Sequence, residues 1–190
     1  MTWNVMIIAL VYLAVLASVP LARGHIGSLA DLPLRRPALA FAAITIQVVV
    51  ISLLPGGDHT IHTTLHLASY FLLGAFAWSN RRIAGVPIIA LGGLSNFLAI
   101  AANGGVMPAD ADAIASLAHN TAQGDFANSQ IVEHPKLLFL GDVFATPASW
   151  PLHNVFSVGD MILVAGVAVL VHVACGTRLV PRRFLRPAVA

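Results

Sequence analysis

Long apolar stretches separated by short polar breaks run through most of the sequence. They cover residues 5–22, 37–54, 61–78, 83–102 and 155–175. A helix rises 1.5 Å per residue, so about 17–25 apolar residues are needed to cross a hydrocarbon core about 30 Å thick. Each stretch meets that length. We therefore expect an all-α fold, a polytopic integral membrane bundle of five transmembrane helices, formed by a single membrane domain over residues 1–190.

The scarcity of charge supports the same expectation. Charged residues make up 9% of the chain and hydrophobic residues 58%, with a mean hydropathy of +0.85. An average soluble domain carries about 25% charged residues. The composition therefore argues against a soluble enzyme and against a disordered chain. A single cysteine, Cys175, excludes an internal disulfide.

Basic residues lie in three segments, 23–36, 81–82 and 178–186, apart from Lys136. Lysine and arginine concentrate on the cytoplasmic side of membrane proteins. We therefore expect a bacterial cytoplasmic (inner) membrane location, with the N-terminus outside and the C-terminus inside. On this interpretation the arginines mark the cytoplasmic side of the membrane and contact the anionic headgroups of membrane lipid. No nucleic acid partner is expected.

A long outer loop, residues 103–154, separates the last two stretches. Its length predicts function or internal structure. We expect a short helix over 110–122, with Asp110 as its cap. The run Asn103, Gly104 and Gly105 reads as a helix stop followed by a turn, and its backbone amides are alternatively part of a binding site at the outer surface.

Polar side chains inside the apolar stretches mark a candidate site, because an ionisable or polar group in lipid is costly. Asp160, Asn96 and His66 come from three stretches and fall in one layer near the outer end. Asp160 has a second interpretation. Ser157 and Asp160 match a capping box, in which serine is the N-cap of a helix and the acid caps the serine amide.

Asp142 is a second acid in reach of this layer, 18 residues before Asp160. Two neighbouring carboxylates do not both ionise easily, so one proton is shared between them. Such a pair can activate a water molecule with one member and protonate a leaving group with the other. Asp142 and Asp160 are therefore the candidate catalytic residues.

Three motifs carry a family resemblance: NGGVMP at 103–108, LGD at 140–142 and FSVGD at 156–160. They resemble the signature of an uncharacterised bacterial membrane family with five spans, a domain of unknown function. The resemblance covers most of the chain. It implies the fold and the membrane location, and it implies no activity.

A second, local similarity joins residues 141–160 to the end of lipoprotein signal peptidase. That family has a V-V-D segment and an F-N-x-A-D segment that supply two catalytic aspartates. The resemblance implies a dyad of Asp142 and Asp160, with residues 92–96 at the place of a G-x-x-G-N stretch. The sequence departs from the pattern at Ser157 and Gly159, which replace asparagine and alanine. It also has no Asp-Arg pair after the 92–96 stretch.

Histidines raise the question of a metal. His59, His62 and His66 share one side of a helix by their spacing, and further histidines lie in the outer loop. A catalytic zinc site needs three converging ligands and an open position, and the sequence has no H-E-x-x-H motif. Interfacial histidines without metal are the simpler interpretation. No cofactor is predicted, and these three histidines are only weak metal candidates.

Three functions are compatible with these residues. The first is a non-catalytic accessory or assembly subunit of a larger membrane complex, with an outward-facing polar site and protein partners in the membrane or at its outer face. Glycine- and alanine-rich stretches suited to close helix contacts support it. The alternative is an aspartic-dyad membrane hydrolase that uses Asp142 and Asp160. A small transporter is the third.

Overall fold

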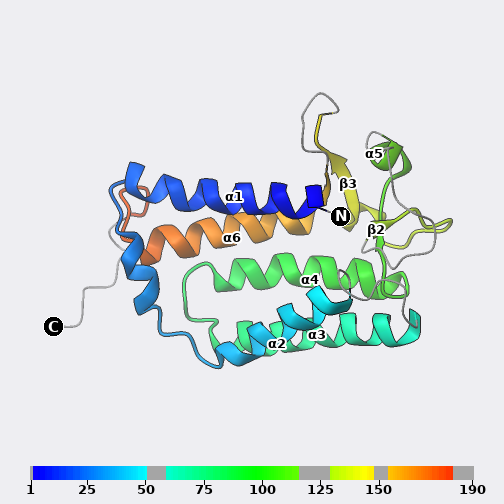
Figure 1. The fold of residues 1–190 in the computed structure, drawn as a ribbon, viewed down its shortest axis with the longest axis horizontal. Coiled ribbons are helices and arrows are strands. Elements are labelled where there is room, and N and C mark those ends of the chain that lie inside the picture. The colour runs from blue at the N-terminus through cyan, green and yellow to red at the C-terminus, as the bar shows by residue number, and fades with distance from the viewer. Residues whose placement is uncertain (1, 51–58, 116–128, 148–153, 182–190) are drawn as a thin grey trace.

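Long helices lie side by side in the computed structural model, which describes residues 2–50, 59–115, 129–147 and 154–181 (Figure 1). The side chains of residues 2–9 and of His59 are not among those described. The helices are α1 (Thr2–Leu21), α2 (Pro37–Val48), α3 (His59–Ser79), α4 (Val86–Ala102) and α6 (Val158–Ala174). They form a row in the order α1, α6, α4, α3 and α2, so the last long helix lies between the first and the fourth.

Local sequence signals explain where these helices begin. α2 starts at Pro37 and α4 has Pro87 in its first turn, where a missing amide hydrogen costs nothing. Gly85, which precedes α4, has φ +88°, a conformation that favours glycine. α6 begins after Ser157, which acts as its N-cap.

Helices α4 and α6 pack closely because glycines face each other across the contact. A Cβ at Gly92 would lie 2.6 Å from the carbonyl oxygen of Gly159, and one at Gly85 would lie 2.5 Å from that of Gly166. Both pairs have seven-residue spacing, which returns to the same side of a helix after two turns. Larger side chains at these positions would push the two helices apart.

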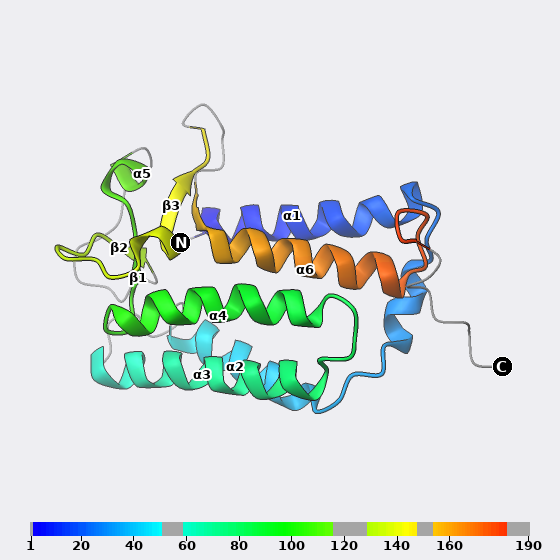
Figure 2. The same ribbon diagram turned by 180° about the vertical axis from the view of Figure 1, so that it is seen from behind.

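Short strands and a small helix cap the end where α4 finishes and α6 begins (Figure 2). In chain order the cap contains β1 (Met107–Pro108), α5 (Ala111–Ala115), β2 (Ser129–Gln130), the 3-10 helix η3 (Leu138–Leu140), β3 (Asp142–Ala145) and β4 (Val155–Ser157). β1 and β2 pair in parallel, and β3 and β4 pair antiparallel. A bridge between Ala109 and Asp142 joins the two pairs.

The expected helix over 110–122 is present where it is described. Oδ1 of Asp110 accepts hydrogen bonds from the amides of Asp112 and Ala113, at 2.9 and 3.2 Å, so the predicted cap is confirmed. α5 extends over Ala111–Ala115, and residues 116–122 lie outside the described part of the chain.

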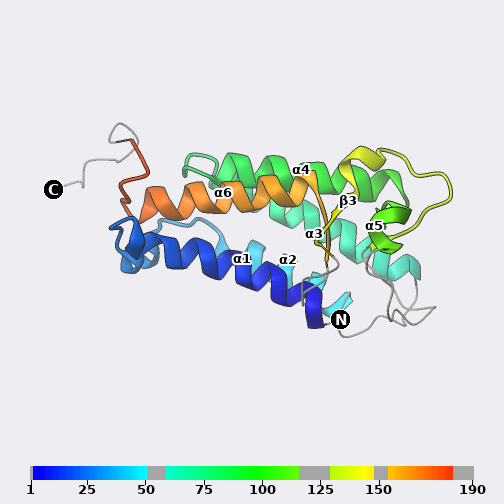
Figure 3. The same ribbon diagram turned by 90° about the horizontal axis from the view of Figure 1, so that it is seen from above.

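Polar side chains link neighbouring helices at two further places. Nε2 of Gln47 in α2 donates to Oγ of Ser69 in α3 at 2.9 Å. At the end opposite the cap (Figure 3), Nε2 of His172 in α6 lies 3.1 Å from Oγ of Ser18 in α1. Ser18 already donates to a backbone carbonyl, so its oxygen accepts from the histidine. Both side chains stabilise helix packing.

The expected membrane bundle is wrong. In the described part of the chain, no helix combines the length and the apolar character needed to cross a membrane. α2 has 12 residues, fewer than a span needs. α4 and α6 have 17 each, at the lower limit of the length range, which at 1.5 Å per residue gives about 26 Å against a core of about 30 Å. α3 has 21 residues, but its first turns are rich in threonine and histidine. The expected inner-membrane location and the orientation of the termini are wrong with it.

Candidate functional site

The candidate site is built around the first turn of α6. Oγ of Ser157 accepts a hydrogen bond from the amide of Asp160 at 3.0 Å, and the amide of Ser157 donates to Oδ2 of Asp160 at 2.9 Å. The predicted capping box is thereby confirmed. Two amides that a helix start leaves without partners are satisfied in this way.

Asn96 brings α4 into the same network. Its Nδ2 donates to Oδ1 of Asp160 at 2.8 Å, and its Oδ1 accepts from Oγ of Ser157 at 2.9 Å. Asn96 and Ser157 are both buried. The three residues therefore form a closed ring of hydrogen bonds between α4 and the start of α6, completed by the backbone amides of Ser157 and Asp160. Gly159 makes room for it, since a Cβ at this position would collide with Oδ1 of Asn96.

Asp142 reaches this region through the cap. It pairs with Ser157 across the β3–β4 ladder, and its backbone oxygen accepts from the amide of Asp110 at 3.0 Å. Its carboxylate accepts a hydrogen bond from Oγ of Ser129. Only 5% of Asp142 is exposed. We name Asn96, Ser129, Asp142, Ser157 and Asp160 the polar cluster.

Burial controls the ionisation of Asp142. Loss of hydration raises the pKa of its carboxyl group to about 6, and the charge of Asp160 acts in the same direction. The hydrogen bond from Ser129 opposes this change because it favours the carboxylate. Asp142 therefore exchanges its proton much nearer to neutral pH than an exposed aspartate does.

Aromatic side chains of α3 and α4 lie near the polar cluster. Tyr70 of α3 packs edge-on against His66 at 5.5 Å between ring centroids and lies 5.6 Å from Phe97 of α4. Burial raises the pKa of Tyr70, and the charges of Asp160 and Asp142 raise it further. Burial lowers the pKa of His66, so this ring is neutral at pH 7.

Both carboxylate oxygens of Asp160 take part in the hydrogen-bond network. One of its oxygens accepts from Ser157 and the other from Asn96. Asp142 differs, because it is buried and holds a proton near pH 6. The site therefore combines hydrogen bonds that join α4 to α6 with one carboxyl group of raised pKa. Raised carboxyl pKa values are common at functional sites and also occur in structural networks.

Other residues expected at the site lie at the end of α4. Nδ2 of Asn103 donates to the carbonyl oxygens of Ala99 and Lys136, and its Oδ1 accepts from the Lys136 amide at 2.8 Å. Gly104 and Gly105 have φ of +70° and +97° and form the turn into β1. Asn103 thus fastens the cap to α4, and none of its polar atoms is directed to the polar cluster by these bonds.

The histidines do not form a metal centre in the described region. No group of three or more His, Cys, Asp or Glu side chains is placed there to hold a metal ion. His62 and His66 are buried on α3, and the side chain of His59 lies outside the described residues.

Two members of the site were missed by the sequence interpretation. Tyr70 follows His66 by four residues, so helical spacing places both on one side of α3 and provides a usable signal. Ser129 lies in β2, and it meets Asp142 because β2 pairs with β1 and the residue after β1 is bridged to Asp142. No local pattern in the sequence indicates that contact.

Most of the chain matches one known protein family. A family model described as "Family of unknown function (DUF5317)" matches residues 31–172. The chain belongs to this family. The matched region includes the whole polar cluster. No curated protein and no solved structure matches the chain.

Proposed function

We propose that this protein is a non-catalytic subunit of a larger assembly, and that its helices bind a partner protein through their outward apolar faces. The observation that carries the proposal is the number of large apolar side chains that its helices expose. On α2, Phe41 is 70% exposed and Ile44 and Val48 are about half exposed. Their spacing of three and four residues aligns them in one stripe.

The same feature recurs on two other helices. On α4, Leu91, Leu94 and Leu98 are exposed with the same spacing. α1 exposes Leu10 and Leu13. These helices are therefore apolar on the side that packs inward and on the side that faces away. A helix that is apolar all round belongs inside a larger structure, and contiguous apolar surface marks an interaction site.

The partner we propose is a protein that presents apolar helices of its own. Such helices match the stripe on α2 by interdigitation of side chains, as in helix packing within a protein. The stripe carries no charge, so hydrophobic burial is the main favourable contribution. Aromatic anchors such as Phe41 contribute most at interfaces of this kind.

The polar cluster supports a structural role rather than catalysis. Asn96, Ser157 and Asp160 satisfy one another and join the cap to α4 and α6. Each oxygen of Asp160 accepts one of these hydrogen bonds, so the carboxylate is held in a fixed orientation at the start of α6.

Site-specific photo-crosslinking tests the proposal. A photoreactive amino acid at Phe41 should capture one defined protein in cells of the native organism. The matched control is Ile131, which is 59% exposed on the cap and away from the helix stripes. The same probe at Ile131 should capture no such protein. Equal capture of many proteins at both positions would contradict the proposal.

A second candidate is an aspartic hydrolase, and it is favoured by the raised pKa of Asp142 beside the charge of Asp160. In this case Asp142 is the proton donor, and Asp160 orients water after release from Asn96. The local similarity to lipoprotein signal peptidase supports a peptide substrate. Hydrolysis of a peptide library that falls by about 100-fold or more in both Asp142→Asn and Asp160→Asn would favour this candidate over the first.

A further inference from the structure

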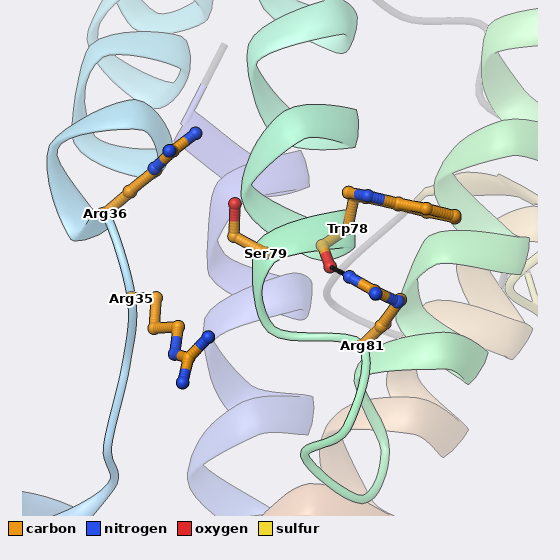
Figure 4. A pocket seen from close by; sticks show the side chains of 5 residues that line it. All are labelled: Arg35, Arg36, Trp78, Ser79 and Arg81. Carbon is orange, nitrogen blue, oxygen red and sulfur yellow. Dashed lines mark hydrogen bonds between the residues drawn. The ribbon is translucent and has the colours of Figure 1, made fainter.

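A basic pocket lies at the end of the helices opposite the cap. It has a volume of about 380 Å³ and is lined by Arg35, Arg36, Trp78, Ser79 and Arg81. Figure 4 shows that Arg35 and Arg36 come from the segment that leads into α2, whereas Trp78 and Ser79 lie at the end of α3 and Arg81 lies in the turn after it. An adjoining pocket of about 460 Å³ shares Arg35, Ser79 and Arg81 and adds Arg82.

Asn80 holds the two walls of the basic pocket together. Its Oδ1 accepts from the amide of Arg35 at 2.7 Å, and its Nδ2 donates to the carbonyl oxygen of Arg35 at 2.9 Å. Nδ2 also donates to the carbonyl oxygen of Phe76 at 2.8 Å. Asn80 is only 2% exposed. The segment before α2 is therefore fixed against α3, and buried hydrogen bonds set the position of the Arg35 backbone across the pocket from Arg81.

Arg81 is itself oriented. Its guanidinium lies 4.3 Å from the centre of the Trp78 ring, and its Nη1 donates to the Trp78 carbonyl oxygen at 2.7 Å (Figure 4). A guanidinium has five N–H donors, so donors remain for a ligand. Ser79 donates its hydroxyl hydrogen to the Ala75 carbonyl oxygen at 2.8 Å, so the donors of the pocket are the arginine side chains.

Positive charge in the basic pocket is not balanced within the described residues. No ion pair there joins Arg35, Arg36, Arg81 or Arg82 to a carboxylate. Arg36 also occupies the N-cap of α2, makes no side-chain capping bond, and has φ +54°. The start of a helix carries positive partial charge, so cations at this place are unfavourable and an anion is favoured.

We propose that the basic pocket binds a phosphate group, held between Arg35, Arg36 and Arg81. Arginine forks match the oxygens of a phosphate in paired hydrogen bonds, and arginine is favoured over lysine where such geometry matters. The adjoining pocket accommodates the rest of a phosphorylated small molecule or of a phospholipid headgroup. Asn80 is a positioning residue, because it acts through the backbone of Arg35. The proposal is independent of the partner-binding role above.

Calorimetric titration of the full chain tests this site. The first arm uses inorganic phosphate and pyrophosphate in a buffer of low ionic strength, with chloride as the reference anion. We expect saturable binding at one site, weakened at least about tenfold in Arg35→Gln and in Arg81→Gln. The matched control is Arg178→Gln, because Arg178 is exposed in the segment after α6 and does not line the pocket.

The second arm identifies the source of the phosphate. Co-sedimentation compares phosphatidylcholine vesicles with and without phosphatidic acid, using the same three variants. Binding of free phosphate that depends on Arg35 and Arg81 supports a small phosphorylated ligand. Binding only to vesicles with phosphatidic acid, with the same dependence, supports a lipid headgroup.

Two results would overturn the phosphate site. One is no binding in either arm, and the other is an equal loss in Arg178→Gln, which would indicate diffuse attraction. Asn80→Ala provides a further check with the charge unchanged. It should weaken phosphate binding, whereas normal binding by a folded Asn80→Ala chain would contradict the positioning role.

Discussion

Asn96 and Asp160 are 64 residues apart in the chain, yet Nδ2 of Asn96 donates to Oδ1 of Asp160 at 2.8 Å. The same asparagine accepts a hydrogen bond from Ser157, the N-cap of the helix that contains Asp160. One side chain of α4 therefore completes the capping network of α6. The start of α6 is defined by tertiary contacts as well as by its own sequence.

Replacing Asn96 should destabilise the fold. Asn96→Ala removes a hydrogen bond to a charged group and leaves the Ser157 hydroxyl without its acceptor. The expected loss is about 2–4 kcal/mol in the free energy of unfolding, measured by chemical denaturation. Asn96→Asp should cost more at pH 7, because it places a second carboxylate against Asp160. An unchanged midpoint for Asn96→Ala would contradict the closed ring.

Gly159→Ala should also destabilise the protein, because the new methyl group collides with Asn96 and lies 2.8 Å from the Gly92 carbonyl oxygen. We expect a loss of about 1–3 kcal/mol. Gly93→Ala is the matched control on α4, since nothing lies within 4 Å of its added Cβ. It should be neutral or stabilise by up to about 1 kcal/mol, through helix propensity. Similar thermal midpoints for the two variants would disprove close packing at Gly159.

Asp142 predicts a pH dependence of stability. Its pKa is raised from 3.8 to about 6 in the folded state, mainly by burial and further by the charge of Asp160. The folded state therefore holds the proton more tightly than the unfolded chain does. Stability from this group is fully present below about pH 4 and is lost as the pH rises through about 6, by roughly 3 kcal/mol in total.

Asp142→Asn isolates that contribution, because asparagine keeps an oxygen acceptor for Ser129 and does not ionise. The variant and the wild type should have similar unfolding free energies near pH 4. Near pH 8 the variant should be the more stable of the two. The difference between the two curves also removes the opposing effect of His66, whose pKa is lowered by burial. A difference that does not vary with pH would contradict a raised pKa at Asp142.

The sequence predicts the helix caps of this fold correctly. The capping box at Ser157 and the cap at Asp110 involve residues within a few positions of each other, so their spacing reveals them. The membrane bundle is predicted from the length of the apolar stretches, and it is wrong because no helix in the described residues has both the length and the apolar character needed to cross a membrane. The start of each of α2, α4 and α6 is set by its N-cap residue, which is Arg36, Gly85 and Ser157, respectively.

The contacts that assemble the polar cluster and the basic pocket could not be predicted from the sequence. Ser129 meets Asp142, and Asn80 meets Arg35, through pairings of segments that are distant in the chain. Neither pair has a spacing that a single sequence can reveal. The closeness of Asn96 to Ser157 depends on the glycine contact between α4 and α6, which sequence shows only as scattered glycines.

The proposed partner-binding role is tested most directly by the native mass of the protein purified gently from its own organism. We expect a stoichiometric complex of this chain with one other protein. The double variant Phe41→Gln, Ile44→Gln should be released as a single folded chain, whereas Ile131→Gln should remain in the complex. A wild-type protein that purifies as a lone monomer, or a complex unaffected by the double variant, would contradict the role.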